Sequence, residues 1–413
     1  MLPHTSDLPQ DFGPYRLLSV LGEGGMARVY RAEKQGRLGF STESALKIMK
    51  RKAGRRSEFV QLLTREAIIG GFLRHPNIVA TIDFNDVDGH YYIAMEYVEG
   101  KTLEALMSAA KESGDGKFPP LLGLDLVQQL CRGLSYAHAL RDRDGKPLDI
   151  IHRDIKPGNI MVSSHGVARL TDFGIAKASV ETGVVTATNV VRGTPLYMSP
   201  EQATGRPLDH RSDLFSVGLI LYEVLTGKRL FEMKDIVSTM ENIARAEVGT
   251  APEELDEVVP GLGPVFRHLM QLNPRARHKD AHELESDLAE LAAELAVTST
   301  DRGTTESVRE SLKSLESSAG LLENNQEPRV TPDPTLPSTA NRIPIARKSL
   351  NDDESIYFED VHDIDGGVLV SISDPDLSSV IEHDALEATQ TEVTSDPVVR
   401  RTHSGLRAFF SRK

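Results

Sequence analysis

The chain has 413 residues, a mass of 45.3 kDa and a formal net charge of -14, with 39% hydrophobic and 26% charged residues. Such acidity disfavours a protein that wraps nucleic acid by neutralising its phosphates, so we expect no nucleic-acid partner. No stretch approaches the roughly 18 apolar residues of a transmembrane segment, and no targeting signal opens the chain. Because Cys131 is the single cysteine, no internal disulfide can form, and we predict a soluble, cytoplasmic protein.

The amino-terminal part of the chain contains short β-rich runs and one helical stretch. The runs lie at residues 15–21, 28–34, 44–49, 79–86 and 90–96, and the helical stretch lies at 57–73. From residue 121 onward helices dominate, with apolar residues on one helical face at Leu122, Leu126, Leu130, Leu134 and Ala137. The pattern predicts an α+β, bilobal fold: a small antiparallel-sheet lobe with one helix, then a larger helical lobe. The cleft between the lobes is the expected place for function.

Composition changes near Leu295. From residue 297 to the end there are 21 Asp and Glu against 12 Lys and Arg, and residues 350–399 hold 14 carboxylates and no Lys or Arg. Such a segment buries too little apolar surface to offset the entropy of ordering it. We therefore predict an N-terminal extension at 1–14, a folded domain at 15–295, and a mostly disordered acidic tail at 296–413 with a short basic end.

A glycine-rich turn occupies residues 21–30, between two of the predicted strands. Glycine lets the backbone press against phosphate oxygens, where a Cβ would hold the amides away. The same run also suits a plain hairpin turn, and Ala27 stands where a third glycine is usual.

Lys47 lies in an apolar predicted strand, in the sequence Ala45-Leu-Lys47. A lysine inside a buried strand needs a partner. Phosphate oxygens and Glu66, from the helical stretch, are the expected partners. The alternative is a lysine on an edge strand that faces solvent.

Two later segments carry the residues best suited to chemistry. Residues 151–160 read Ile-His-Arg-Asp-Ile-Lys-Pro-Gly-Asn-Ile, and residues 170–174 read Leu-Thr-Asp-Phe-Gly. Phosphoryl transfer needs a positioned nucleotide, neutralised charge and an oriented hydroxyl. Asp154 can accept the hydroxyl proton, and Lys156 can lie beside the transferring phosphate. Asn159 and Asp172 offer oxygen ligands to Mg²⁺.

Taken in this order, the motifs resemble those of serine/threonine protein kinases, specifically the bacterial eukaryotic-like (Hanks-type) branch. The resemblance runs from about Tyr15 to Leu295 and includes Ser199-Pro-Glu201, where Ser199 replaces the more usual alanine. It implies a non-specific serine/threonine protein kinase that transfers the ATP γ-phosphate to protein substrates in bacterial signalling. A pseudokinase, and a scaffold whose tail carries the function, are the competing hypotheses.

The resemblance also implies roles for individual residues. Lys47, paired with Glu66, would hold the α and β phosphates, while Asn159 and Asp172 would hold Mg²⁺ or, alternatively, Mn²⁺. At a hinge between the lobes, the backbone of two residues would meet the adenine edge, and these are Glu96 and Val98. The remaining ATP-binding positions are Leu21, Gly22, Glu23, Gly24, Gly25, Val29 and Ala45.

By the same resemblance, Lys156 and Thr194 are typical of members directed to serine and threonine. Arg153 marks members that are switched on by phosphorylation of the activation loop, here residues 175–192. The candidate autophosphorylation sites in that loop are Thr182, Thr186 and Thr188, where a phosphate would pair with Arg153. Unmodified threonines are the alternative.

Three further residues match structural anchors of the family. Asp213 resembles a helix aspartate that braces the catalytic loop, and Glu201 and Arg277 resemble a buried ion pair of the larger lobe.

The tail ends in a basic segment, residues 400–413, in which Leu406, Phe409 and Phe410 fall on one face of a helix. Such a segment suits a helix that docks on a signalling partner or on a membrane surface. A solvated terminus, or one that folds back on the acidic stretch, is the favoured interpretation, because Gly405 and the short length argue against an independent helix.

Overall fold

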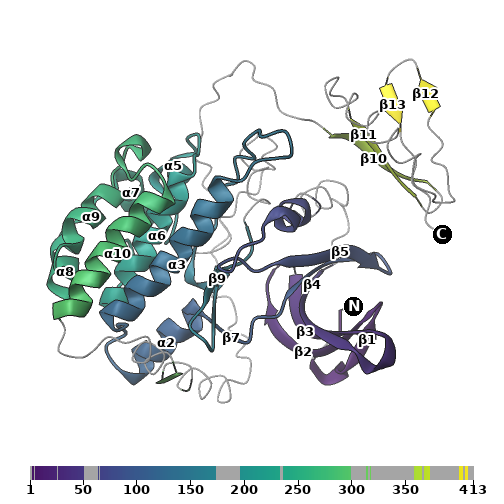
Figure 1. The fold of residues 1–413 in the computed structure, drawn as a ribbon, viewed down its shortest axis with the longest axis horizontal. Coiled ribbons are helices and arrows are strands. Elements are labelled where there is room, and N and C mark those ends of the chain that lie inside the picture. Colours follow the sequence, from purple (N-terminus) through teal and green to yellow (C-terminus); the bar gives the residue numbers. More distant parts are fainter. Residues whose placement is uncertain are drawn as a thin grey trace, which may run out of the picture. The chain divides into compact units, whose positions relative to one another are not determined.

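The computed structural model describes residues 2–3, 5–25, 27–50, 64, 66–173, 196–232 and 236–298, and farther on 313–314, 317, 358–364, 367–372, 400–402 and 405–407. The chain divides into two compact units, Met1–Val330 and Thr331–Lys413. The first unit contains the sheet lobe and the helical lobe (Figure 1).

The sheet lobe is built on six antiparallel strands in the order β1-β2-β3-β4-β6-β5 (Figure 1). Their bounds are β1 Gln10–Phe12, β2 Tyr15–Glu23, β3 Ala27–Gln35, β4 Ser41–Met49, β5 Thr81–Val87 and β6 His90–Glu96. Residues 66–72 are helical and belong to the predicted helical stretch. The prediction of a small antiparallel sheet is confirmed.

Alternation along the strands divides this sheet into a core face and an open face, and a smaller cluster, Ala27, Met49, Ala67 and Ile93, covers the open face in part. In β4, Leu46 and Ile48 are fully buried, while Ala45 and Lys47, which alternate with them, are half-buried. A period of two is what places successive side chains on opposite faces of a strand. The buried face packs into a core with large aromatic side chains from β2, β3 and β6, which are Tyr15, Tyr30 and Tyr92.

The segment before residue 15, predicted as an extension, contributes to this lobe. Strand β1 pairs with β2, with Phe12 opposite Tyr15, and Phe12 joins the core. The Pro3 carbonyl accepts hydrogen bonds from Arg28 Nη1 at 2.6 Å and from Tyr30 Oη at 2.8 Å. Sequence periodicity did not indicate β1, because three residues are too few to show a pattern.

The helical lobe surrounds a nearly fully buried helix. Helix α6, Arg211–Thr226, has every residue after the first buried, so its apolar surface runs all round rather than along one stripe. Helix α3, Pro120–His138, buries the predicted apolar stripe from Leu122 to Ala137. Besides α3 and α6, the helices are α2 Leu103–Ser113, α5 Pro200–Thr204, α7 Ile236–Arg245, α8 Ala251–Val258, α9 Leu262–Leu269 and α10 Ala281–Thr298.

Short elements complete the first unit. A small antiparallel sheet contains the three strands β7 Gly100–Thr102, β8 Ile160–Ser163 and β9 Ala168–Leu170. In the sequence, β7 comes before the predicted catalytic segment, and β8 and β9 come after it. The 3₁₀ turns are η1 Thr5–Asp7, η2 Arg37–Gly39, η3 Pro157–Asn159 and η4 Pro274–Ala276. Within the ranges given above, no helix is both long and apolar enough to cross a membrane.

The described part of the tail contains strands. In the second unit, β10 Phe358–Ile364 pairs antiparallel with β11 Gly367–Ile372, and β12 Arg400–Thr402 pairs with β13 Gly405–Arg407. Leu406 therefore lies in a strand and not on the helical face expected from the sequence. Phe409 and Phe410 lie outside the described residues. Helix α10 ends at Thr298, beyond the predicted domain end at Leu295.

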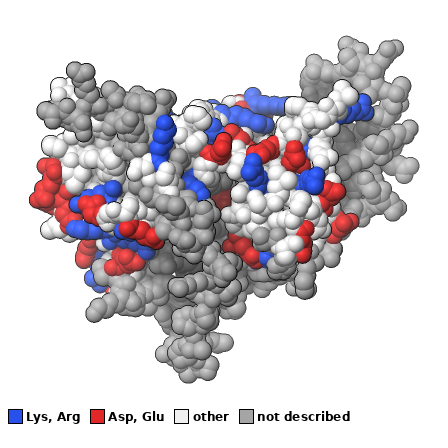
Figure 2. Space-filling model, turned by 90° about the horizontal axis from the view of Figure 1, so that it is seen from below, with Lys and Arg blue, Asp and Glu red and all other residues white. Residues whose placement is uncertain are grey.

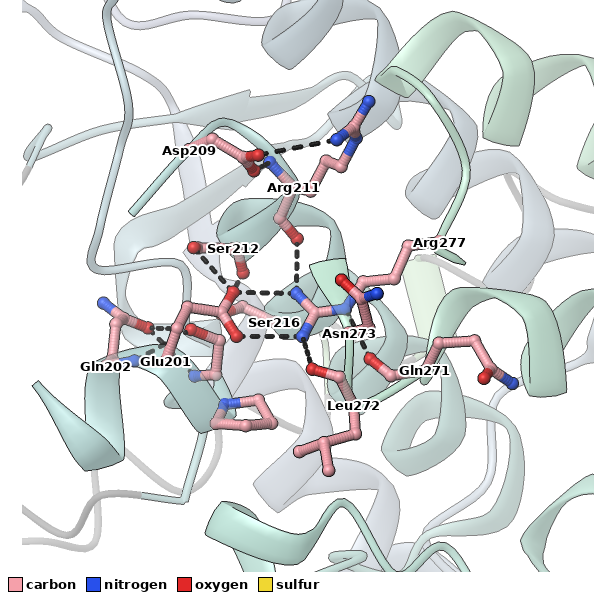
Figure 3. Close-up of polar contacts among 12 residues, drawn as sticks. Glu201, Gln202, Asp209, Arg211, Ser212, Ser216, Gln271, Leu272, Asn273 and Arg277 are labelled. Atoms are coloured by element: carbon pink, nitrogen blue, oxygen red, sulfur yellow. Dashed lines mark hydrogen bonds and ion pairs between the residues drawn. The ribbon is translucent and has the colours of Figure 1, made fainter. Parts of the chain in front are cut away.

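A buried ion pair ties helix α5 to the segment after the turn η4 (Figure 3). Arg277 Nη1 lies 2.8 Å from Glu201 Oε1, and Arg277 Nη2 lies 2.9 Å from Glu201 Oε2. Ser212 Oγ also donates to Glu201 at 2.7 Å. Burial acts to raise the pKa of Glu201, but the hydrogen bonds and charge of Arg277 lower it below its usual value. The pair expected from the sequence is confirmed.

The remaining donors of this arginine are also satisfied. Arg277 Nε donates to the Gln271 carbonyl at 2.7 Å, and Nη1 donates to the Arg211 carbonyl at 3.0 Å. The guanidinium also lies over the Phe215 ring, 4.8 Å from its centroid. A buried charge is tolerated only with such complete pairing, so removal of one partner is costly.

Exposed charges, in contrast, are spread widely. Figure 2 shows acidic and basic side chains interspersed over one face of the molecule. Several exposed pairs are close: Lys228 Nζ lies 2.8 Å from Glu254 Oε2, and Arg267 contacts Glu253. Exposed pairs of this kind contribute only about 0–1 kcal/mol each, because water screens them.

These two classes of ion pair give a matched stability test. Arg277→Met should lower the free energy of unfolding by about 3–5 kcal/mol, because it leaves Glu201 buried and unpaired. Arg267→Met, the same substitution in an exposed pair, should lower it by less than about 1 kcal/mol. Urea unfolding followed by circular dichroism measures both values. Equal losses of unfolding free energy in the two variants would contradict the larger stabilising role assigned to the buried pair.

Candidate active site

Strand register brings the predicted nucleotide-binding residues of the sheet lobe into one row. Gly22 pairs with Val29, and Val29 pairs with Lys47 on the next strand. Ala45 pairs with Met95 near the end of β6. Paired residues share a face of the sheet, so Val29 and Lys47 lie together on the face that the core leaves open.

Neither the backbone conformation nor the packing of the described residues requires glycine at Gly22 or Gly24. A Cβ at Gly22 would meet no atom within 4 Å, and one at Gly24 would meet only the Ala27 carbonyl at 3.8 Å. Neither residue has the left-handed φ that favours glycine. A plain hairpin would not require glycine here, so the open space favours close approach of a ligand.

Glu23, in the same turn, is held by two cations. Its Oε2 accepts from Arg28 Nη2 at 2.6 Å and from Arg28 Nε at 3.0 Å, and its Oε1 accepts from Lys50 Nζ at 2.5 Å. Lys50 Nζ also donates to the Gly24 carbonyl at 2.8 Å. Hydrogen bonds from Lys50 and then Arg28 lower the pKa of Glu23. The carboxylate therefore anchors the turn to β3 and to the residue after β4.

Sequence reasoning did not identify Arg28, which is largely buried although charged. The sequence feature that could have pointed to it is an arginine at the start of the strand that follows the glycine-rich turn. Through Pro3 on one side and Glu23 on the other, Arg28 links the N-terminal segment to this turn.

Lys47 lies between two carboxylates. Its Nζ is 3.0 Å from Glu66 Oε1 and 2.7 Å from Asp172 Oδ1, and its side chain is only 16% exposed. Burial acts to lower the pKa of Lys47, but the charges of Asp172 and Glu66 outweigh it and raise the pKa, so the ammonium stays protonated. Strand β4 has β3 and β6 as neighbours, so the solvent-facing edge-strand alternative is wrong.

The segment after Arg153 brings a carboxylate, an amine and an amide together. Asp154 Oδ2 accepts from Lys156 Nζ at 3.0 Å and from Asn159 Nδ2 at 2.9 Å. Asn159 Nδ2 also donates to the Asp154 carbonyl at 2.9 Å. Since both hydrogen bonds use the amide nitrogen, the Asn159 side-chain oxygen is the atom left for another partner.

A hairpin places Asp172 beside this cluster. Asn159 directly precedes β8, and Asp172 follows β9 by two residues, while Ile160 at the start of β8 pairs with Leu170. The Thr171 amide donates to the Asn159 carbonyl at 3.0 Å. Because Asp172 also contacts Lys47, groups from both lobes form one site.

Asp213 braces the backbone of the catalytic segment. Its Oδ2 accepts from the His152 amide at 2.8 Å, and its Oδ1 accepts from the Arg153 amide at 2.9 Å. His138 Nε2 also lies 2.8 Å from Oδ2. Arg153 has a left-handed φ of 64°, a strained conformation for a residue with a side chain. The hydrogen bonds therefore hold strained backbone directly before Asp154.

This carboxylate is 1% exposed. Burial acts to raise the pKa of Asp213, but the hydrogen bond and charge of His138, with the charge of His152, lower it below its usual value. His138 was not identified from the sequence, since a histidine at the end of an amphipathic helix has no local signal.

Two other contacts fix the neighbourhood of the cluster. The ring of His152 lies against Phe173 with centroids 4.4 Å apart, and His152 Nε2 lies 3.1 Å from the Thr171 carbonyl. Gln202 Nε2 donates to the Arg153 carbonyl at 2.9 Å. The segments before Asp154 and around Asp172 thus pack directly on each other.

The predicted hinge follows β6. The Glu96 amide donates to the Ala80 carbonyl at 2.9 Å, and the Glu96 side chain pairs with Arg169. Val98 is largely buried, and among the described residues neither its N–H nor its C=O has a hydrogen-bond partner. The N–H and C=O of Val98 are therefore available to form hydrogen bonds with the edge of a bound ligand.

Some predicted residues lie outside the described ranges. They are Thr182, Thr186, Thr188 and Thr194. Gly25 and Leu21 lie in the described turn, where Leu21 is exposed.

The donor set fits a hard divalent cation. The side-chain oxygen of Asn159, which has no hydrogen bond to the described residues, and the partly exposed carboxylate of Asp172 are ligands of the kind that Mg²⁺ prefers. A cation there would lie beside the ammonium of Lys47, so the site combines several positive charges suited to a polyphosphate.

Comparison with known proteins gives consistent matches. The protein kinase domain family model matches residues 15–331. The chain is 34% identical over 274 residues to tyrosine-protein kinase MasK of Myxococcus xanthus, covering 66% of this chain and 42% of that protein. It is 36% identical over 276 residues to serine/threonine-protein kinase PrkC of Bacillus subtilis, covering 67% and 40%.

A third relative is serine/threonine-protein kinase PknB of Mycobacterium leprae, with 34% identity over 290 residues, covering 69% of this chain and 43% of that protein. The chain therefore spans less than half the length of these relatives.

Asp213→Asn tests the brace. An asparagine oxygen cannot accept all three hydrogen bonds, so the free energy of unfolding near neutral pH should fall by about 2 kcal/mol or more. Asp209→Asn, a half-exposed aspartate just before the same helix, is the control and should change it by less than about 1 kcal/mol.

The pH dependence of this loss provides a second check. Because the folded-state pKa of Asp213 lies below the unfolded value of about 3.9, its stabilisation is fully present above about pH 4 and is lost as pH falls through the folded-state pKa. In urea unfolding from about pH 7 to about pH 3, the gap between wild type and Asp213→Asn should narrow only below about pH 4. If the difference in the free energy of unfolding narrowed already near neutral pH, the stabilisation could not be assigned to the ionised Asp213 carboxylate.

Proposed function

The chain belongs to the protein kinase family, and we propose that it transfers the γ-phosphoryl group of ATP to serine and threonine hydroxyls of protein substrates. The observation that carries the proposal is the meeting of Lys47, Glu66 and Asp172 with the Asp154, Lys156 and Asn159 cluster. Phosphoryl transfer depends mainly on positioning and on charge stabilisation, and these six side chains supply both.

Asp154 is the proposed acceptor of the substrate hydroxyl proton. Its carboxylate is fixed by Lys156 and Asn159, so its orientation does not depend on the substrate. Lys156, more exposed than Asp154, would reach the transferring phosphate. Together they would orient the hydroxyl and stabilise the charge that develops in the transition state.

The nucleotide would lie on the open face of the sheet. The turn from Gly22 to Val29 would cover the phosphates, Ala45 would face the base, and Lys47 would bind the α and β phosphates. The groups of Val98 without protein partners support an adenine contact there, and the Glu96 carbonyl would complete it.

Asn159 and Asp172 are the proposed ligands of Mg²⁺, with Mn²⁺ as the alternative. The ion would neutralise phosphate charge and fix the geometry of the polyphosphate. The oxygen donors of the two side chains support this assignment.

Specificity for serine and threonine is proposed from Lys156 and Thr194. The names of PrkC and PknB agree with it, whereas MasK is named a tyrosine kinase. The phosphorylated amino acid therefore has to be identified in the product.

We further propose that the kinase domain occupies residues 15–295 and autophosphorylates Thr182, Thr186 or Thr188, with Arg153 as the partner of the new phosphate. The reaction would draw on the ATP pool of the cytoplasm. The acidic tail, 296–413, with its basic end, is the proposed docking region for a signalling partner; the high density of carboxylates between residues 350 and 399 supports a charged contact.

Asp154→Asn tests the reaction itself. The variant should transfer labelled γ-phosphate from ATP to a generic protein substrate about 100-fold to 10,000-fold more slowly, because the proton acceptor is lost. Asp144→Asn, an exposed aspartate in a surface turn, should keep wild-type activity. Phosphoamino-acid analysis of the product should give phosphoserine and phosphothreonine. Equal incorporation by Asp154→Asn, or none by the wild type, would support the pseudokinase or scaffold hypotheses instead.

Arg28→Met tests the anchor of the glycine-rich turn. Without Arg28, Glu23 loses its link to β3, and we expect the KM for ATP to rise about tenfold while kcat changes less, as for the loss of a charge-assisted hydrogen bond. Arg16→Met, which removes an exposed arginine from β2, should leave the KM for ATP unchanged. A fall in kcat with constant KM would speak against a nucleotide-positioning role.

A further inference from the structure

Away from the kinase site, three side chains with metal-binding atoms converge at one end of the helical lobe. His268 is in the last turn of α9, His278 follows the turn η4, and Asp287 is in α10. One donor atom from each lies within 4.8 Å of the other two. No other group of three such residues is close enough in the described parts of the chain.

The contacts within the cluster are specific. His278 Nε2 lies 3.1 Å from Asp287 Oδ2, and the rings of His268 and His278 lie 4.1 Å apart at an angle of 34°. His278 is fully buried, Asp287 is partly exposed, and His268 is exposed. A histidine–aspartate hydrogen bond alone would account for His278 and Asp287, but it leaves the second imidazole unexplained.

We propose that His268, His278 and Asp287 form a binding site for a divalent ion of the zinc class. Two imidazoles and one carboxylate suit Zn²⁺ and its transition-metal neighbours, whereas Mg²⁺ prefers oxygen ligands. Three protein ligands leave a fourth position for water. The site is therefore distinct in chemistry from the oxygen donors of Asn159 and Asp172.

The geometry needs only a small adjustment. Donor atoms around tetrahedral Zn²⁺, with bonds of about 2.0–2.2 Å, lie about 3.4 Å apart. The His278 to Asp287 separation already fits this value. Exposed His268 can close the remaining gap by rotating to another rotamer.

Access from solvent also favours the ion. A surface depression of about 270 Å³ reaches Asp287 and gives a hydrated ion a path from solvent. Glu290 and Glu294 line the same depression and add negative charge there.

The ion would join α9 to α10. Its ligand His278 directly follows Arg277, which forms the buried ion pair with Glu201. Since it would bind the folded state in preference to the unfolded one, it should raise the melting temperature.

The test is a titration of the full-length, untagged protein with Zn²⁺ in excess Mg²⁺, followed by calorimetry. The wild type should bind one equivalent, with a rise in melting temperature. His268→Ala and Asp287→Asn should each weaken binding by about tenfold or more. His282→Ala removes an exposed histidine outside the cluster and should bind as the wild type does.

Because His268 and Asp287 are exposed or partly exposed, these variants should fold, and circular dichroism checks that they do. Co²⁺ provides an independent readout: in the wild type it should give the intense visible absorption of a four-coordinate site, and in His268→Ala it should not. No binding by the wild type, or equal affinity in all four proteins, would overturn the proposal. Neither outcome affects the kinase assignment, which the Asp154→Asn comparison tests separately.

Discussion

The hydrogen bonds of Asp213 support the geometry of the whole candidate active site. This carboxylate, on the most buried helix of the larger lobe, binds the amides of His152 and Arg153 and the ring of His138. The next residue, Asp154, is therefore placed by a buried anion, and Lys156 and Asn159 take their positions from Asp154 in turn. An unpaired buried charge is costly, so the folded lobe cannot easily release this segment.

The charge balance of the site between the two lobes indicates that a bound polyphosphate would need a cation. The five charged groups of the site, Lys47, Lys156, Glu66, Asp154 and Asp172, carry a net charge of -1. A polyphosphate brought there would add further negative charge, so the site needs a cation to bind it. This need supports the proposal that the cation binds to partly exposed Asp172 and to the Asn159 side-chain oxygen, which has no hydrogen bond to the described residues.

Sequence reasoning recovered what local pattern or chemistry specifies. The strands at 28–34 and 90–96 follow from alternation, and the requirements of phosphoryl transfer selected side chains that the structure brings together, with their roles still proposals. It missed contacts between distant residues, such as His138 with Asp213 and Arg28 with Pro3, because no periodicity predicts which buried polar groups will meet. Leu406 shows a limit of periodicity: the spacing of the apolar residues suits a helical face, but Gly405 argues against a helix, and the chain forms a short strand there.

The contact between Pro3 and Arg28 has a practical consequence for work on the isolated catalytic domain. A protein trimmed to begin at Tyr15 would lose the carbonyl that accepts from Arg28 and Tyr30, together with the strand that covers Tyr15. Arg28 would then be free to shift, and Glu23 would shift with it. Nucleotide affinities measured on such a fragment would understate those of the intact chain, although every residue proposed to bind ATP would be present.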